Sequence, residues 1–304
     1  MKKVLITYRL KPEGLTALNE KYEITLPKEK SFFSREEVLE LIPEYDVLVP
    51  NFSFYTDKEI MDRGTKLRLI SNYGVGFNNI DVEYATEKGI VVTNIPNTTR
   101  EPTAEFAFAL LLGAARRVGY YDRKIRTPQG VSWGTYADGG LPVYGKTLGI
   151  IGMGRIGQSL ARRAIASGMQ IIYNNRNRLT EEIEKQYDAR YVSKEELLQT
   201  ADFISLNAPS TPETYRMIGE EEFNMMKPTA VFINTARGDM VDEKAMAKAL
   251  KENRIWAAGL DVYENEPHIL PELLELDNVL LAPHAGTKTL EDRIAMSVEM
   301  AQNI

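Results

Sequence analysis

Three side chains capable of acid–base and ionic chemistry each follow an apolar stretch that is typical of a buried strand. Arg237 comes after VFINTA, Glu266 lies in the loop after AAGLD, and His284 comes after LLAP. An arginine can fix a carboxylate, and a histidine can exchange a proton with a carbonyl oxygen near neutral pH. A carboxylate beside that histidine favours its protonated form. Because open α/β sheets bind ligands at the carboxyl ends of their strands, the three residues predict one site for a small carbonyl acid.

Each of these residues also has a purely structural interpretation. Arg237 could cap a strand end, Glu266 could be solvated, and His284 could be an ordinary loop residue. Their spacing alone does not decide between the two interpretations.

The stretch LGIIGMGRIGQSLARRAIASGMQIIYNNR, residues 148–176, predicts a strand, a glycine-rich turn, a helix and a second strand. Gly152 permits the tight turn, Gly154 lets a pyrophosphate approach the backbone, and Gly157 lets the helix pack close to the sheet. The amide groups at the start of the helix then face the phosphates. The spacing therefore predicts a dinucleotide site, and the alternative is a glycine-rich turn that binds nothing.

The residues after the second strand indicate which dinucleotide is bound. They are Asn174, Asn175, Arg176, Asn177 and Arg178, where NAD-binding units usually carry an acid for the ribose hydroxyls. No carboxylate is present to repel a 2′-phosphate, and arginine forms charge-assisted bonds with phosphate. We therefore expect NADP(H) to be favoured, with Asn175 and Arg176 as contacts. NAD(H) is the alternative if Arg176 only stacks on the adenine, and we expect Arg178 to be a solvated surface residue.

The part of the chain that follows residue 147 is predicted to form a Rossmann sheet. Six apolar runs alternate with helical segments after the glycine-rich turn, which is typical of a doubly wound α/β domain. The expected strands are 148–151, 170–174, 202–207, 230–234, 257–261 and 278–282. The expected helices are 156–167, 194–200, 220–226 and 243–252.

The first 98 residues predict a second, smaller doubly wound α/β unit. Its expected strands are 4–7, 23–26, 46–50, 67–72 and 90–95. Helices are expected at 34–42, where Ser34 and Glu37 form a capping box, and at 57–63.

Three further segments stand outside this alternation. Residues 102–117 are apolar on nearly all sides and predict a helix buried between larger bodies. Residues 119–145 contain several glycines, two prolines and Trp133, and predict a long irregular connection that is functional or packed against a partner. Residues 290–304 predict a final helix without a cap, so we expect a further C-terminal tail that is missing or disordered.

Composition excludes several classes of protein. A length of 304 residues suits two domains. The net charge of −6 gives no indication of nucleic acid or of an anionic membrane, and no apolar run approaches the length of a membrane span. The absence of cysteine excludes disulfides, thiolate zinc sites and cysteine nucleophiles, and it fits a reducing cytoplasm. We expect a cytoplasmic protein that binds a small molecule and no metal.

Six motifs in fixed order resemble the D-isomer-specific 2-hydroxyacid dehydrogenase family over essentially the whole chain. They are NYGVGFNNID at 72–81, TAEFAFALLLGAARR at 103–117, GIIGMGRIGQ at 149–158, INTARGDMVDEKAMAKAL at 233–250, GLDVYENEP at 259–267 and PHAGTKT at 283–289. The resemblance implies a flavodoxin-like substrate domain of residues 1–98 and 288–304, a Rossmann domain of residues 99–287, and a cleft between them. It also implies hydride transfer from NAD(P)H to a small 2-keto acid, which gives the D-2-hydroxy acid.

The resemblance assigns roles to individual residues. Arg237 would orient the substrate carboxylate and keto oxygen, His284 would be the general acid/base, and Glu266 would pair with His284. The backbone of Val75 and Gly76 would hold the substrate carboxylate. The further cofactor contacts that the family pattern implies are Thr103, Arg155, Ile156, Asn207, Ala208, Pro209, Thr214, Thr235, Ala236 and Asp261. His268 matches no family motif.

The motif NYxVGxxNID, together with NNR, is most similar to the glyoxylate/hydroxypyruvate reductase branch, which commonly prefers NADPH. All 2-keto acids share a carboxylate and a carbonyl, so glyoxylate, hydroxypyruvate and 2-ketogluconate are all candidate substrates. The family forms homodimers through the cofactor domain, and we expect a homodimer here. Trp133 would either reach the substrate of the neighbouring subunit or pack in the dimer interface.

Two other functions are alternatives on the same scaffold. Some relatives are dinucleotide-sensing corepressors that keep the Arg, Glu and His set, so a binding protein is the first alternative. A formate or phosphonate-type dehydrogenase is the second, and Glu266 argues against the formate enzyme, which carries glutamine at that position.

Overall fold

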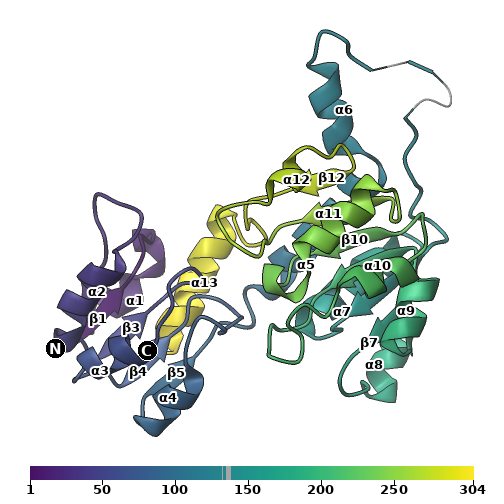
Figure 1. Ribbon diagram of the computed structural model, residues 1–304. Helices are drawn as coiled ribbons and strands as arrows, with labels where there is room; N and C mark the ends of the chain where they lie inside the picture. The colour runs from purple at the N-terminus through teal and green to yellow at the C-terminus, as the bar shows by residue number, and fades with distance from the viewer. Residues whose placement is uncertain (132, 135–137) are drawn as a thin grey trace. The chain divides into compact units, whose positions relative to one another are not determined.

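The computed structural model describes residues 1–131, 133–134 and 138–304, and the chain divides into two compact units. The first unit consists of Met1–Arg100 and Thr287–Ile304, and the second of Glu101–Gly286 (Figure 1). Each unit contains one parallel sheet with helices on both faces, so the expected α/β class with two doubly wound domains is confirmed. The assignment of one unit to the substrate and the other to the cofactor stays a prediction.

The sheet of the first unit has five strands in the order β2-β1-β3-β4-β5, which is the flavodoxin-like order. Its strands are β1 (Lys2–Ile6), β2 (Tyr22–Thr25), β3 (Val47–Val49), β4 (Leu69–Ser71) and β5 (Val91–Thr93). All four neighbouring pairs are parallel. Short apolar strands such as VLV in β3 are buried because both faces of the sheet are covered.

Two hydrophobic cores lie on the two faces of this first sheet. On one face the core includes Val38 and Ile60, and on the other it includes Leu18 and Met296. The first face is covered by α2 (Arg35–Leu41), α3 (Lys58–Arg63) and α4 (Val82–Glu87), and the second by α1 (Thr16–Asn19) and α13 (Leu290–Gln302). Short 3₁₀ turns span Pro12–Gly14 and Ile42–Glu44. The capping box is confirmed, because Ser34 accepts from the Glu37 amide and the Glu37 side chain accepts from the Ser34 amide.

The sheet of the second unit has seven parallel strands in the order β12-β11-β10-β9-β6-β7-β8. Counted from the glycine-rich turn, this is the 3-2-1-4-5-6 order of a Rossmann sheet with one strand added at the edge. The strands are β6 (Thr147–Ile151), β7 (Gln170–Asn174), β8 (Ala189–Tyr191), β9 (Phe203–Leu206), β10 (Val231–Asn234), β11 (Ala257–Leu260) and β12 (Val279–Leu281).

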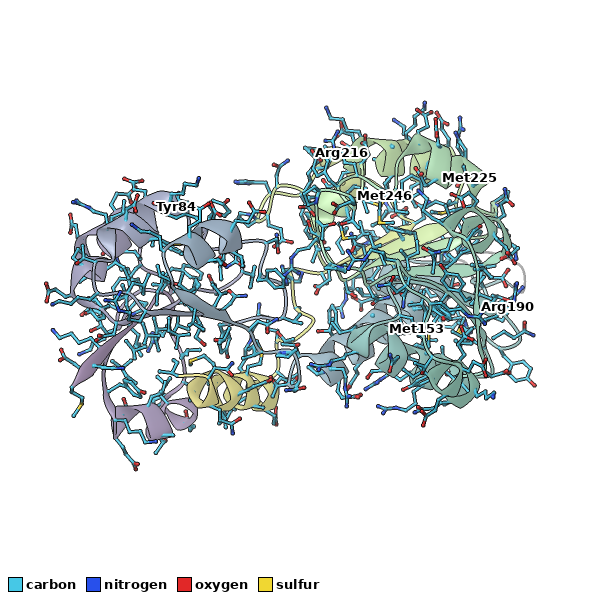
Figure 2. The ribbon with its side chains drawn as sticks, turned by 90° about the horizontal axis from the view of Figure 1, so that it is seen from below. Tyr84, Met153, Arg190, Arg216, Met225 and Met246 are labelled. Carbon is cyan, nitrogen blue, oxygen red and sulfur yellow. The ribbon has the colours of Figure 1, made fainter. Side chains whose placement is uncertain are left out.

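The helices of the second unit fall into two layers around this sheet. One core contains Leu197, Phe223 and Met246, and the other contains Leu111, Met153 and Leu160. Figure 2 labels Met246 of the first core and Met153 of the second. The first layer is α9 (Lys194–Thr200), α10 (Glu220–Met225), α11 (Glu243–Lys251) and α12 (Pro271–Leu274), and the second includes α5 (Arg100–Ala115) and α7 (Arg155–Ala166). The helix expected at 102–117 is thus present as α5 and is buried against the sheet.

Several elements of the second unit were not expected from the sequence, among them the one-turn helix α12. The edge strand β8 and the helix α8 (Glu181–Gln186) precede α9, and α6 (Val118–Ile125) lies in the segment expected to be irregular. Neither α8 nor α6 has a buried residue, and β8 has only three residues, so none of them carries a strong apolar pattern. In Figure 1, α6 projects from the body of its unit. In the described part of the chain, no helix combines the length and apolar character that crossing a bilayer requires.

Candidate active site

The register of the second sheet brings the ends of five strands to one level. Ile151 of β6 pairs with Leu206 of β9, which pairs with Asn234 of β10. Asn234 pairs with Leu260 of β11, and Leu260 pairs with Leu281 of β12. The loops that leave these strands therefore start side by side at the carboxyl edge, where ligands bind in open α/β sheets. These loops carry Gly152, Asn207, Arg237, Glu266 and His284.

The glycine-rich turn is built as its spacing predicts. Gly152 has a φ of +93°, and a Cβ added there would lie 2.4 Å from the backbone nitrogen of Ala208. A Cβ on Gly157 would lie 2.6 Å from the Gly152 carbonyl oxygen, so the helix packs directly against the turn. A Cβ added to Gly154, the N-cap of α7, would meet nothing within 4 Å. The backbone beside the first turn of α7 is thus open to a ligand, as a pyrophosphate site requires.

Three of the polar residues after β7 differ in their surroundings. Asn175 accepts a hydrogen bond from the Met153 amide at 2.6 Å, so its side chain braces the glycine-rich turn. Arg178 binds both carboxylate oxygens of Glu184 at 2.9 and 2.8 Å. Arg176 is exposed, and no hydrogen bond or ion pair ties it to another residue in the part of the chain that the structure describes. Arg176 is therefore a charged side chain of this segment that can turn to a ligand.

Two buried polar atoms at this edge have no hydrogen-bond partner among the described residues. They are Oδ1 of Asn207, after β9, and Oγ1 of Thr235, after β10. A buried polar atom without a partner is costly, which indicates that a ligand completes the site. Thr214, by contrast, is engaged locally, because its hydroxyl donates to the Pro209 carbonyl at 2.8 Å. Together with the open backbone at Gly154, these two atoms fit a dinucleotide.

Arg237 is held at the end of β10 by its neighbours. The side-chain amide of Asn234 donates to the Arg237 carbonyl at 2.9 Å, and its oxygen accepts from the Ala236 amide at 3.0 Å. One guanidinium nitrogen donates to the Ala236 carbonyl at 2.7 Å. Burial lowers the pKa of Arg237, while the carboxylates of Glu266 and Asp239 act in the opposite direction. The bracing role of Asn234 was missed in the sequence, where an asparagine at a strand end has no distinctive signal.

Asp261 organises the loop that carries His284. Its side chain is buried, and its two oxygens accept from the Ala285 amide at 2.6 Å and the Gly286 amide at 2.8 Å. The backbone carbonyl of Asp261 also accepts from the His284 amide at 2.9 Å. Burial raises the pKa of Asp261, against the lowering effects of these amides and of His284. The expected contact of Asp261 with the cofactor stays a prediction, and its hydrogen bonds also brace this loop.

His284 and Glu266 form a hydrogen-bonded pair. Nδ1 of His284 lies 2.8 Å from Oε2 of Glu266, and about a quarter of each side chain is exposed. The other Glu266 oxygen accepts from the Tyr263 amide at 3.1 Å. Burial raises the pKa of Glu266, but the hydrogen bond with His284, the charge of His284, the Tyr263 amide and Arg237 together hold it below its usual value. The pair can hold and move a proton while one partner stays charged.

The loop after β4 of the first unit carries Val75 and Gly76. The side-chain amide of Asn72 donates to the Gly76 carbonyl at 2.6 Å, and that of Asn94 donates to the Val75 carbonyl at 2.8 Å. Asn79 donates in turn to Asn72 at 3.1 Å. The two peptides expected to hold a carboxylate are thus fixed in orientation by asparagine side chains.

Two other predicted residues have contrasting positions in the second unit. Thr103, near the start of α5, lies beside the His284 loop, because a Cβ added to Gly286 would meet its side chain at 3.6 Å. Trp133 is 93% exposed and does not join the candidate site in the single chain.

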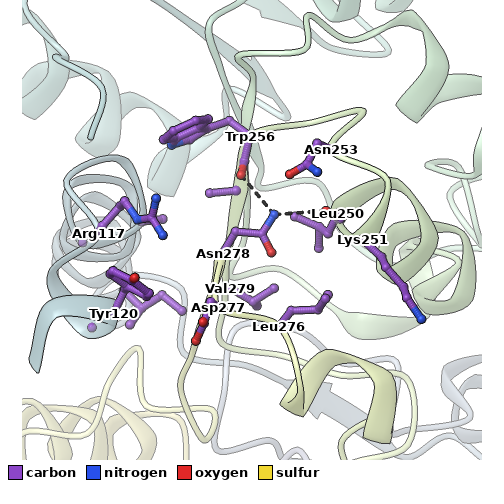
Figure 3. A pocket seen from close by; sticks show the side chains of 15 residues that line it. Arg117, Tyr120, Leu250, Lys251, Asn253, Trp256, Leu276, Asp277, Asn278 and Val279 are labelled. Carbon is purple, nitrogen blue, oxygen red and sulfur yellow. Dashed lines mark hydrogen bonds between the residues drawn. The ribbon is translucent and has the colours of Figure 1, made fainter. Parts of the chain in front are cut away.

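A separate cavity of about 280 Å³ lies in the second unit, away from these residues (Figure 3). Its lining includes Trp256 and Asn278, which precede β11 and β12 and so mark the amino edge of the sheet. The amide of Asn278 donates to the carbonyls of Leu250 and Trp256, and the guanidinium of Arg117 lies 4.0 Å from the centre of the Tyr120 ring. The cavity therefore opens at the edge opposite to the candidate active site.

Comparison with known proteins identifies the family. Residues 108–286 match the model of the D-isomer specific 2-hydroxyacid dehydrogenase, NAD binding domain. The chain belongs to the D-isomer specific 2-hydroxyacid dehydrogenase family, which confirms the resemblance inferred from the motifs.

Individual relatives agree with this membership. The chain is 44% identical to the glyoxylate reductase of Thermococcus onnurineus over 306 residues, which covers 99% of this chain and 91% of that protein. The crystal structure of a glyoxylate reductase from Paecilomyes thermophila matches with a TM-score of 0.89 at 35% identity, covering 99% of this chain and 94% of that one. An NADPH-dependent glyoxylate/hydroxypyruvate reductase from Sinorhizobium meliloti, in complex with NADP and malonate, matches with a TM-score of 0.87 at 30% identity. The match covers 99% of this chain and 92% of that one.

Proposed function

We propose that the protein reduces a small 2-keto acid, of the glyoxylate or hydroxypyruvate type, to the D-2-hydroxy acid with NADPH as the favoured reductant. The observation that carries the proposal is the His284–Glu266 hydrogen bond at the sheet edge that also carries Arg237 and the glycine-rich turn. Glyoxylate reductases that match nearly the whole chain support the same substrate class.

The cofactor supplies a hydride to the keto carbon when it is bound. Arg237 offers a planar guanidinium that pairs with the substrate carboxylate and stabilises the negative charge that develops on the keto oxygen. Nε2 of His284 donates a proton to that oxygen, and Glu266 on Nδ1 stabilises the charged imidazolium before transfer. The backbone of Val75 and Gly76 stays the contact that the family resemblance implies for the substrate carboxylate.

The preference for NADPH rests on the segment after β7. Asn175 and Arg178 are already engaged with protein partners, whereas Arg176 is exposed. We infer that Arg176 pairs with the 2′-phosphate, because no acidic side chain occupies residues 174–178. The Sinorhizobium meliloti reductase in complex with NADP supports this cofactor as an option on the fold.

We also propose that the protein is a cytoplasmic homodimer, assembled through the segment that contains α6. Val118, Ile125 and Trp133 are exposed apolar side chains within or just after this helix. Exposed apolar side chains that gather on one segment favour an interface with another chain. Analytical ultracentrifugation tests the dimer, and an Ile125→Glu variant that stays dimeric would contradict this interface.

The experiment that tests the proposed activity is a steady-state panel. Glyoxylate, hydroxypyruvate, pyruvate and 2-ketogluconate are each offered with NADPH and with NADH. We expect the highest kcat/KM for glyoxylate or hydroxypyruvate with NADPH. Tight dinucleotide binding without turnover of any of these acids would instead support a dinucleotide-sensing binding protein.

A further inference from the structure

Tyr263 contacts Glu266 of the proposed acid–base pair and the backbone just before the loop that carries His284. Its side chain is 5% exposed and belongs to the core between the sheet and the α9–α11 layer. Its backbone amide donates to Oε1 of Glu266 at 3.1 Å. Its hydroxyl donates to the Ala282 carbonyl at 2.8 Å and accepts from the Ala282 amide at 3.1 Å. Ala282 stands two residues before His284, so Tyr263 links the Glu266 loop to the His284 loop.

The segment that contains Tyr263 is also held by contacts with residues that follow β10 in the chain. A Cβ added to Gly238 would lie 1.9 Å from the Tyr263 carbonyl carbon, so the two backbones are in direct contact. The buried carboxyl of Glu243 accepts from the Glu264 amide at 2.7 Å. Gly238 directly follows Arg237, so this contact ties the loop to the strand end that carries the arginine.

We propose that Tyr263 is a positioning residue that sets the geometry between Glu266 and His284 and thereby the efficiency of proton transfer. The inference rests on the proposed function. The hydroxyl is the part of Tyr263 that reaches the His284 loop, whereas the ring only fills the core. A hydroxyl that served packing alone would affect stability and leave the proton chemistry unchanged.

Tyr263→Phe is the direct test, because phenylalanine keeps the ring and removes the hydroxyl. We expect kcat for reduction to fall roughly 5- to 50-fold, since small displacements of reacting groups are costly, while KM for NADPH is unchanged. Glu266 and Asp261 are charged groups that act on His284, and Arg237 acts on Glu266. With Glu266 displaced, the basic limb of the kcat/KM profile should move to lower pH.

Tyr45→Phe is the matched control for losing a buried tyrosine hydroxyl. Tyr45 is 7% exposed and its hydroxyl donates to Thr25 at 2.7 Å in the first unit, before β3. We expect this variant to keep the wild-type pH profile and kcat. If Tyr263→Phe does not fold, Glu243→Ala loosens the same loop by removing the acceptor of the Glu264 amide, and the same displacement of the basic limb is expected.

A double-mutant cycle with His284→Ala decides whether Tyr263 acts through the imidazole. We expect the Tyr263→Phe change to have little effect on the residual rate once His284 is absent. The proposal would be overturned if Tyr263→Phe lowered the rate equally with and without His284, or if it left the basic limb of the kcat/KM profile unmoved. A wild-type protein that turns over no 2-keto acid would instead contradict the proposed function, so the two failures are distinguishable.

Discussion

Nδ1 of His284 lies 2.8 Å from Oε2 of Glu266, although the two residues belong to loops that follow different strands. His284 has a φ of +50°, a left-handed conformation that is unusual for a residue with a side chain. The three amides of His284, Ala285 and Gly286 all donate to Asp261, and these bonds hold the loop in this shape. Residues held in such conformations by their surroundings often occur at functional sites.

Glu266→Gln should shift the pH dependence of reduction. The Glu266 carboxylate lies 2.8 Å from the His284 imidazole, and the charge of His284 is one of the effects that lower the pKa of Glu266. Glutamine keeps the shape but loses the charge, so the pH above which reduction fails should move downward. The measurement is a pair of pH profiles of kcat/KM for wild type and variant. An unmoved basic limb would show that Glu266 does not tune His284.

Arg176→Ala should weaken the binding of NADPH more than the binding of NADH. The loss of charged hydrogen bonds to a 2′-phosphate costs about 1.5–3 kcal/mol, which is roughly 10- to 150-fold in binding. Arg178→Ala is the matched control, because Arg178 is committed to Glu184 and should leave the ratio of NADPH to NADH binding unchanged. Titration calorimetry with both dinucleotides measures the effect. If the binding of NADPH and of NADH weakened equally, Arg176 would instead stack on the adenine.

Arg237→Lys should not preserve activity. An ammonium group cannot reproduce the planar fork that pairs with a carboxylate and a carbonyl oxygen together. We expect kcat/KM for the 2-keto acid to fall by at least about 100-fold, because the interaction contributes to binding and to the transition state. Initial rates under subsaturating substrate give this value directly. A variant within a few-fold of wild type would refute the role of Arg237.

Gly154→Ala and Gly152→Ala should separate ligand binding from folding. An alanine at Gly154 meets no protein atom within 4 Å, so the variant should keep its melting temperature while its affinity for NADPH falls roughly tenfold or more. An alanine at Gly152 would clash with Ala208 in a left-handed backbone, so the variant should be destabilised. Thermal melts with and without NADPH measure both. Unchanged affinity in Gly154→Ala would place the pyrophosphate elsewhere.

The strong patterns of the sequence predicted most of this architecture. The glycine-rich turn, the apolar strands and the cap at Ser34 are local signals, and each lies within a residue or two of its expected place. The edge strand β8 and the exposed helices α6 and α8 bury too few residues to leave such a signal.

The candidate site was predictable only in its chemistry. Arg237, Glu266 and His284 could be chosen because each follows a predicted strand, has a side chain suited to the chemistry and matches a family pattern. The roles of Asn234, Asp261 and Tyr263 depend on hydrogen bonds between separate strands, which no local pattern specifies.

The central claim, reduction of a 2-keto acid at His284, is tested most directly by NADPH oxidation with glyoxylate and with hydroxypyruvate at neutral pH, in wild type and His284→Ala. We predict saturable turnover of at least one acid by the wild type and a kcat roughly 10²–10⁴-fold lower in the variant, with NADPH binding retained. Turnover that persists at the wild-type rate in His284→Ala, or a wild type that binds NADPH but reduces neither acid, would contradict the account.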